Sequence, residues 1–263
     1  MNNVVRDHML TLLAENVRED GRQFHAIRDI TVEYGVSAKS AEGSARVCIG
    51  NTEVVAGVKM ELGVPYPDTP NQGSLMVSVE LLPMANKDFE MGPPGVHAIE
   101  MSRVIDRGLR ESKQISFEKL CISSGEKAWN ILIDVYPLND DGNLFDATAL
   151  AALAALQDAC LPTLQNGVVD YSKRTKTSLP LGDMPITCTI VKIGSTLLVD
   201  PGFNETAFSE ARLTISVLSD GSLCSLQKGG DTGLAVEDIE AMIDLAQSTA
   251  ETYRKVLTHG SKK

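Results

Sequence analysis

The spacing of apolar residues predicts four helices, over residues 4–17, 97–113, 146–161 and 234–259. In the first and the last of these, apolar side chains recur every three or four residues, which is typical of a helix that packs one face on a core. Residues 146–161 are rich in Ala and Leu on every face. We therefore expect this third helix to be buried all round.

Alternating or continuous apolar runs, bounded by Gly, Pro, Asn or Asp, predict the strands. They cover residues 29–34, 44–49, 53–62, 74–82, 117–121, 129–136, 186–193, 196–199, 211–218 and 224–227. Gly50 and Asn51 indicate a hairpin between the second and third strands. Residues 64–73 are expected to form a loop. Because strands and helices do not alternate as regular βαβ units, the predicted fold class is α+β.

The order of these elements predicts two lobes. An N-terminal helix and loop take residues 1–28, the first lobe takes 29–165, and a polar connector takes 166–183. The second lobe, with the C-terminal helix, takes 184–263, and residues 261–263 are expected to form a frayed tail.

Composition narrows the possible classes. The chain has 263 residues, 43% of them hydrophobic and 22% charged, which is ordinary for a soluble globular protein. The longest apolar run, residues 149–156, is too short to span a bilayer, so no membrane contact is expected. The N-terminus lacks a signal-peptide pattern, and we expect a cytoplasmic protein.

No cofactor or metal is expected from the motifs. Dinucleotide-binding, P-loop and nucleophile-elbow patterns are missing from the sequence. Five scattered cysteines and four histidines provide no metal-ligand spacing, which argues against a zinc site and against a disulfide framework. The net charge of −11 requires any binding of nucleic acid to use a local basic patch or a partner chain.

A candidate basic patch lies on the helix predicted over residues 97–113. At about 100° per residue, Arg103, Arg107 and Arg110 fall within about 60° of one another, and apolar residues take the opposite side. Guanidinium groups bind phosphates bidentately. Arg103 and Arg107 are about 6 Å apart along the helix axis, comparable to the phosphate spacing of an extended strand. The alternative is a solvated face whose arginines pair with neighbouring acids such as Asp106 and Glu111.

Several motifs resemble the RNase PH superfamily. Residues 18–22 (Arg-Glu-Asp-Gly-Arg) with 28–30 (Arg-Asp-Ile) are similar to its N-terminal signature, and residues 43–59 are similar to its first long hairpin. Residues 183–187 resemble the start of its second lobe. The resemblance covers nearly the whole chain. It implies an RNase PH fold, in which each lobe is an RNase PH-like domain related to the second domain of ribosomal protein S5.

Active members of that superfamily carry groups that this sequence replaces. Where they have a Gly-Thr/Ser-Arg loop for phosphate, the matching arginine position holds Phe145. Where they have two aspartates for acid or metal chemistry, this chain has Thr206 and Arg212. An arginine pair before the basic helix matches Val96 and His97. The resemblance therefore implies a chain with no catalytic residues of its own.

Within the superfamily, the chain resembles the non-catalytic ring subunit of the archaeal exosome. This implies three heterodimers with a catalytic RNase PH-like paralogue, RNA-binding cap subunits, and single-stranded RNA degraded from its 3′ end by phosphate. In that subunit the residues matching Arg103 and Arg107 approach the RNA, and helical geometry adds Arg110. Such a subunit structures the active site of its catalytic neighbour.

Two alternatives stay open at this point. The chain could itself be a phosphorolytic 3′→5′ exoribonuclease whose displaced site uses Asp183, Asp200 and Glu205. It could also be a general scaffold that does not contact RNA.

Overall fold

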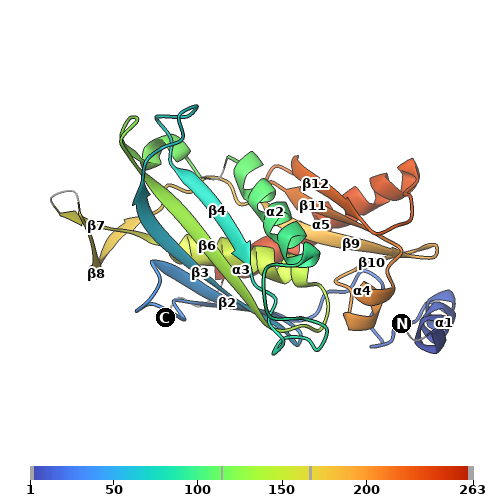
Figure 1. Ribbon diagram of the computed structural model, residues 1–263. Coiled ribbons are helices and arrows are strands. Elements are labelled where there is room, and N and C mark those ends of the chain that lie inside the picture. The colour runs from blue at the N-terminus through green and yellow to red at the C-terminus, as the bar shows by residue number, and fades with distance from the viewer. Residues whose placement is uncertain (1–2, 114, 166–167, 260–263) are drawn as a thin grey trace.

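The computed structural model describes residues 3–113, 115–165 and 168–259 (Figure 1). Its first sheet has the strand order β1 (Ile30–Tyr34), β2 (Gly43–Ile49), β3 (Thr52–Gly63), β6 (Lys127–Asn139), β4 (Ser74–Val79). Only β4 runs parallel to its neighbour in this series, and the short β5 (Cys121–Ser123) pairs with β6. The second sheet has the order β10 (Thr196–Val199), β9 (Ile186–Ile193), β11 (Ala211–Val217), β12 (Leu223–Gly229), all antiparallel.

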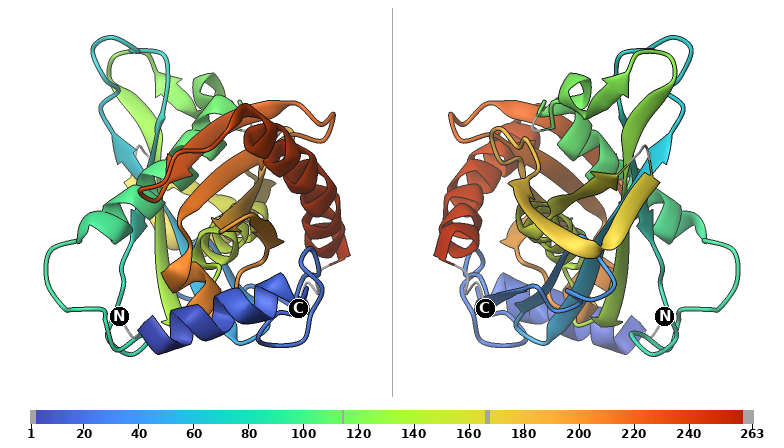
Figure 2. Two further views of the ribbon diagram at one scale, coloured as in Figure 1. Left: turned by 90° about the vertical axis from the view of Figure 1, so that its right-hand side faces the viewer. Right: turned by 90° about the vertical axis from the view of Figure 1, so that its left-hand side faces the viewer.

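Five α-helices and one 3₁₀-helix are found in the described ranges. They are α1 (Asn3–Ala14), α2 (Val96–Glu111), η1 (Phe117–Leu120), α3 (Leu144–Asp158), α4 (Phe203–Phe208) and α5 (Val236–His259). Helix α1 packs Met9 and Leu13 against β9 and β10, and α5 lies along β9 and β11 (Figures 1 and 2). The predicted α+β class is confirmed.

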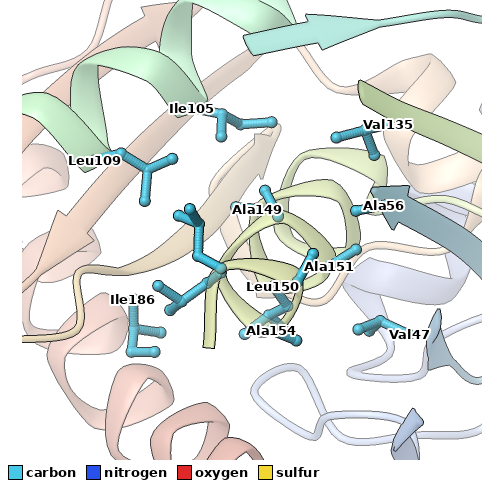
Figure 3. Close-up of a cluster of buried hydrophobic side chains, with 14 of the residues drawn as sticks. Val47, Ala56, Ile105, Leu109, Val135, Ala149, Leu150, Ala151, Ala154 and Ile186 are labelled. Atoms are coloured by element: carbon cyan, nitrogen blue, oxygen red, sulfur yellow. The ribbon is translucent and has the colours of Figure 1, made fainter. Parts of the chain in front are cut away.

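Helix α3 lies at the centre of the molecule, between the two sheets. Figure 3 shows Val47, Ala56 and Val135 of the first sheet on one side of α3, with Ile186 of the second sheet and Ile105 and Leu109 of α2 on the other. The helix is buried from Ala147 to Leu156, as its Ala- and Leu-rich sequence predicts. One continuous apolar cluster therefore joins both lobes.

Small residues allow this close packing. A Cβ atom on Gly43 of β2 would lie 2.3 Å from the carbonyl oxygen of Ala155 and 2.5 Å from the backbone of Ala159. No side chain fits there unless helix α3 moves away from the sheet.

Three segments differ from their predicted structure. Residues 117–120 form η1 rather than a strand, because the apolar Phe117 and Leu120 are three apart, at 3₁₀ spacing. The segment 166–183, expected as a polar connector, contains β8 (Val168–Ser178), which pairs with β7 (Cys160–Gln165) in an outlying hairpin (Figure 1). Only a few of its apolar residues, such as Leu161 and Val169, pack against the core, so the segment has no regular apolar alternation. The six-residue α4 was not predicted.

The remaining elements match the predictions, with ends that differ by a few residues. The tail at 261–263 lies outside the described residues. The five cysteines are all free. Among the described helices, none is long and apolar enough to cross a membrane.

Candidate functional site

Helix α2 presents the three arginines of the predicted basic face to solvent. Arg103, Arg107 and Arg110 are exposed, whereas Val104 and Leu109 are buried against the core. The amphipathic pattern of α2 produces this arrangement, because the apolar side chains fix the rotation of the helix.

Arg110 already has partners within the chain. Its guanidinium donates to Asp106 Oδ1 at 2.8 Å and to the backbone carbonyl of Leu75 in β4 at 2.9 Å, and it lies 5.7 Å from the ring centre of Phe117. The hydrogen bond and the charge of Asp106 raise the pKa of Arg110. Arg110 thus fastens α2 to the edge of the first sheet, which leaves less of its guanidinium for a ligand.

Arg103 and Arg107 differ from Arg110 in this respect. Neither side chain makes a hydrogen bond or an ion pair within the part of the chain that the structure describes. Both line a groove of about 420 Å³ between α2 and the edge strand β12, which we call the α2–β12 groove. Its lining comprises Glu100, Arg103, Val104, Asp106, Arg107, Arg110 and Glu111 from α2 and Ser225, Leu226 and Gln227 from β12. These two guanidinium groups are available to bind phosphates.

Phe145 and Arg212 lie in contact with each other. The Arg212 guanidinium lies over the Phe145 ring, 4.1 Å from its centre, and also forms an ion pair with Glu100 of α2. Arg212 crosses strand β12 at Gly229, where a Cβ atom would lie 2.5 Å from Arg212 Cζ. A cation over an aromatic face is a favourable contact. The two residues that the family resemblance matches to catalytic positions thus lie in contact with each other.

The surroundings of that contact have little capacity for phosphate or proton chemistry. Thr206, which the resemblance matches to an aspartate of active members, is exposed on α4 and receives a long 3.5 Å hydrogen bond from the backbone of Asn143. The apolar ring of Phe145 has no donor for a phosphate oxygen, and a guanidinium does not act as a general base. Val96 and His97 are exposed on the first turn of α2.

A buried network of ion pairs lies behind this site. Arg18, which is 1% exposed, donates from Nε to Glu205 Oε1 at 2.9 Å. Arg28 donates to both carboxylate oxygens of Asp200, at 2.9 and 2.7 Å, and Arg22 donates to Asp200 Oδ2 at 2.9 Å. These bonds fasten the segment 18–28 to the second lobe. The sequence of residues 18–30 resembles a family signature, but it does not indicate which carboxylates pair with Arg18, Arg22 and Arg28.

Of the carboxylates proposed for a displaced active site, Asp200 and Glu205 belong to this network, whereas Asp183 contacts the turn after β11. Burial by itself would raise the pKa of Asp200, but its hydrogen bonds and charge contact with Arg28 lower it below the usual value. Glu205 is occupied by Arg18, and Asp183 accepts a hydrogen bond from the backbone of Ser219 at 2.9 Å. Two of the three are therefore paired with arginines, Glu205 with the buried Arg18 and Asp200 with the half-buried Arg28. This arrangement favours structural roles for Asp200 and Glu205.

A further buried carboxyl group, that of Asp146, lies in the first turn of α3. It is fully buried, and it accepts hydrogen bonds from Asn143 Nδ2 and the Tyr253 hydroxyl, both at 3.1 Å. Burial raises the pKa of Asp146 to about 7, against the lowering effect of hydrogen bonds from Thr189 and Asn143. The charge of Asp200 raises it further. This group links α3, α5 and the second lobe.

A search of the described residues finds no cluster of three or more His, Cys, Asp or Glu side chains that could hold a metal ion.

Comparisons with known proteins cover nearly the whole chain. Residues 26–162 match the model of the 3′ exoribonuclease family, domain 1, and residues 183–249 match domain 2 of the same family. The exosome complex component Rrp42 of Methanosarcina acetivorans is 44% identical over 258 residues, which is 98% of this chain and 95% of that protein. Rrp42 of Methanothermobacter thermautotrophicus is 42% identical over 245 residues, 92% of this chain and 90% of that protein.

Solved structures of archaeal exosomes also contain chains that are similar to this one over nearly its full length. A chain of the Archaeoglobus fulgidus exosome with RNA bound to the active site superposes with a TM-score of 0.90 at 40% identity, covering 96% of this chain and 97% of that one. A chain of an archaeal exosome core superposes with a TM-score of 0.87 at 37% identity. The match covers 98% of this chain and 97% of that one.

Proposed function

The chain belongs to the RNase PH family of 3′ exoribonucleases, and from this membership we propose that it is a non-catalytic subunit of an archaeal-type exosome ring. In that role it helps to bind RNA and structures the active site of a catalytic neighbour, which degrades RNA from the 3′ end with phosphate. The membership confirms the resemblance predicted from the sequence motifs.

The contact between Phe145 and Arg212 carries the non-catalytic part of the proposal. An aromatic ring and a guanidinium, 4.1 Å apart, stand at positions where active members of the family hold phosphate and carry a carboxylate. The Phe145 ring has no donor for a phosphate oxygen, and the Arg212 guanidinium can neither bind a cation nor transfer a proton as a carboxylate does. Turnover therefore takes place in the neighbouring subunit.

Arg103 and Arg107 carry the RNA-binding part. They have no partner in the described part of the chain, and they lie one helical turn apart on the exposed face of α2. Their charges attract phosphates although the chain as a whole has a net charge of −11. We include Arg110 in the RNA-binding face, with a smaller contribution because it is bonded to Asp106 and Leu75.

The proposed partners follow from the relatives. Three copies of this chain alternate with three copies of a catalytic RNase PH-like paralogue, RNA-binding cap subunits cover one face, and single-stranded RNA enters the ring. Two of the most similar relatives are named as exosome components, and one superposed structure is an exosome with bound RNA. We place this complex in the cytoplasm.

Charge reversal of the two free arginines tests the RNA-binding role. The variant Arg103→Glu/Arg107→Glu, in the complex with the catalytic paralogue, is expected to bind a labelled RNA at least about ten-fold more weakly. The slope of log K against log salt is expected to fall by about 0.7 for each lost phosphate contact. Arg110→Glu should weaken binding less.

A matched control has the same change in charge at another surface. Lys39→Glu/Arg46→Glu alters the loop before β2 and β2 itself, outside the α2–β12 groove, and should leave RNA affinity nearly unchanged. Size-exclusion chromatography checks that each complex still assembles. Unchanged affinity and salt dependence in the Arg103/Arg107 variant, with assembly intact, would refute the role of these arginines.

A further inference from the structure

The α2–β12 groove has a second wall, formed by strand β12, to which no role has been given. We propose that Gln227 on this wall contacts the base of a nucleotide whose phosphates are bound by Arg103 and Arg107. This inference rests on the proposed RNA-binding function and adds to it a subsite for the base of single-stranded RNA.

Two contacts place Gln227 relative to α2. At one end, the thiol of Cys224 approaches the carbonyl oxygen of Gly108 at 3.8 Å. At the other end, Arg212, whose register partner on β12 is Gly229, forms an ion pair with Glu100. Residues 224 and 229 of β12 therefore lie beside residues 108 and 100 of α2. Gln227, between them on the strand, lies beside the helical turn that carries Arg103.

The strand register directs the side chain of Gln227 toward the helix. Thr214 is the register partner of Gln227, and Arg212, two residues before Thr214, reaches α2 through its ion pair with Glu100. Side chains two residues apart on a strand share a face. Gln227 accordingly lines the groove together with the arginines of α2.

The hydrogen-bonding groups of Gln227 are nearly unused. Its amide nitrogen makes one long contact, 3.4 Å, with the carbonyl oxygen of Lys228. A carboxamide has two N–H donors and an acceptor oxygen, so most of this capacity is available to a ligand in the groove. The side chain is half-buried, which limits its motion and its access to competing water.

The charges of the groove fit a nucleotide. Of the three acidic side chains in the lining, Asp106 is paired with Arg110 and Glu100 with Arg212, while Glu111 is exposed at the C-terminal end of α2. The wall formed by α2 thus retains the free cations Arg103 and Arg107, and the opposite wall has a neutral amide. The free arginines can bind a phosphate, and the amide of Gln227 can hydrogen-bond the polar edge of a base. Proteins recognise unstacked single-stranded RNA by this combination of contacts. The volume of about 420 Å³ is within the range of small-ligand pockets.

The test compares RNA with and without bases. The complex of the full chain with its catalytic paralogue is titrated, in the absence of phosphate, with a labelled oligoadenylate and with an abasic ribose-phosphate strand of equal length. Gln227→Leu, which keeps the size of the side chain but removes its hydrogen bonds, should weaken binding of the oligoadenylate about five-fold. Its affinity for the abasic strand should not change.

Two further variants separate the two proposals. Arg103→Glu/Arg107→Glu should weaken binding of both strands, and Gln72→Leu, in the turn before β4 and outside the groove, should change neither. If Gln227→Leu weakens both strands equally, or neither, the base subsite is refuted while the arginine result still supports the proposed function. If the arginine variant affects neither strand, the proposed function fails together with the subsite.

Discussion

Arg212 and Phe145 form a contact between two segments that lie far apart in the chain. Together they form a cation–aromatic contact, and Glu100 supplies the counter-charge. Because each partner stabilises the other, a single reversion at either position would not recreate a phosphate site.

Asp146 leads to a prediction about pH. An unfolded Asp ionises near pH 3.9, whereas burial keeps the native group protonated up to about pH 7. Between these values the unfolded state binds fewer protons, so stability falls as the pH rises. Asp146→Asn removes this dependence but keeps an acceptor for Asn143 and Tyr253. Its free energy of unfolding relative to wild type should rise by about 2–3 kcal/mol between about pH 5 and about pH 8.

Urea titrations at several pH values measure this difference. Asp231→Asn, at an exposed position in the loop after β12, is the control and should give a difference that is independent of pH. A constant difference for Asp146→Asn as well would show that Asp146 is ionised in the native protein throughout this range.

At the level of single residues, the sequence predicted what depends on local periodicity. Arg103 and Arg107 are exposed on one helix face because the apolar residues of α2 fix its rotation. The partner of Arg110 in β4, and the contact between Phe145 and Arg212, join segments far apart in the chain. Such contacts depend on the tertiary fold, which no local pattern specifies.

Among the elements, α3 depends most on its neighbours. Its Ala-rich surface lets β2 approach so closely that Gly43 has no room for a side chain. Gly43→Ala forces a Cβ atom against the backbone of Ala155 and Ala159, and overpacking of this kind costs about 1–3 kcal/mol. We expect a lower thermal midpoint for this variant, measured by circular dichroism.

Gly233→Ala is the matched control for this prediction. A Cβ atom there meets no other atom within 4 Å, so its thermal midpoint should stay close to that of wild type. A Gly43→Ala variant as stable as the control would mean that α3 and β2 are packed less tightly than described.

Helices and strands with a strong pattern were predictable, and those without one were not. The long helix α5 and the hairpin of β2 and β3 follow their apolar periodicity. Strand β8 is largely polar and pairs with β7 in a separate two-stranded sheet, so no apolar alternation indicated it. Helix α4 has six residues, fewer than two turns, which is too short for a periodic signal.

For the whole molecule, the acidic charge and the proposed RNA role are compatible because of where the charges lie. The net charge of −11 is that of the whole chain, but α2 presents the unpaired Arg103 and Arg107 side by side on its exposed face. In the proposed ring, only the surface along the RNA path has to be basic. A single copy of this chain is therefore expected to bind RNA weakly, and to bind it well only beside its catalytic partner.

The central claim is that this chain supports phosphorolysis without performing it. The most direct measurement is release of nucleoside diphosphates from RNA, with phosphate and magnesium, by the purified chain, by the catalytic paralogue and by the two combined. We predict no release above background by the chain alone and the highest rate for the combination. Enzymatic release of nucleoside diphosphates by the chain alone would contradict the account.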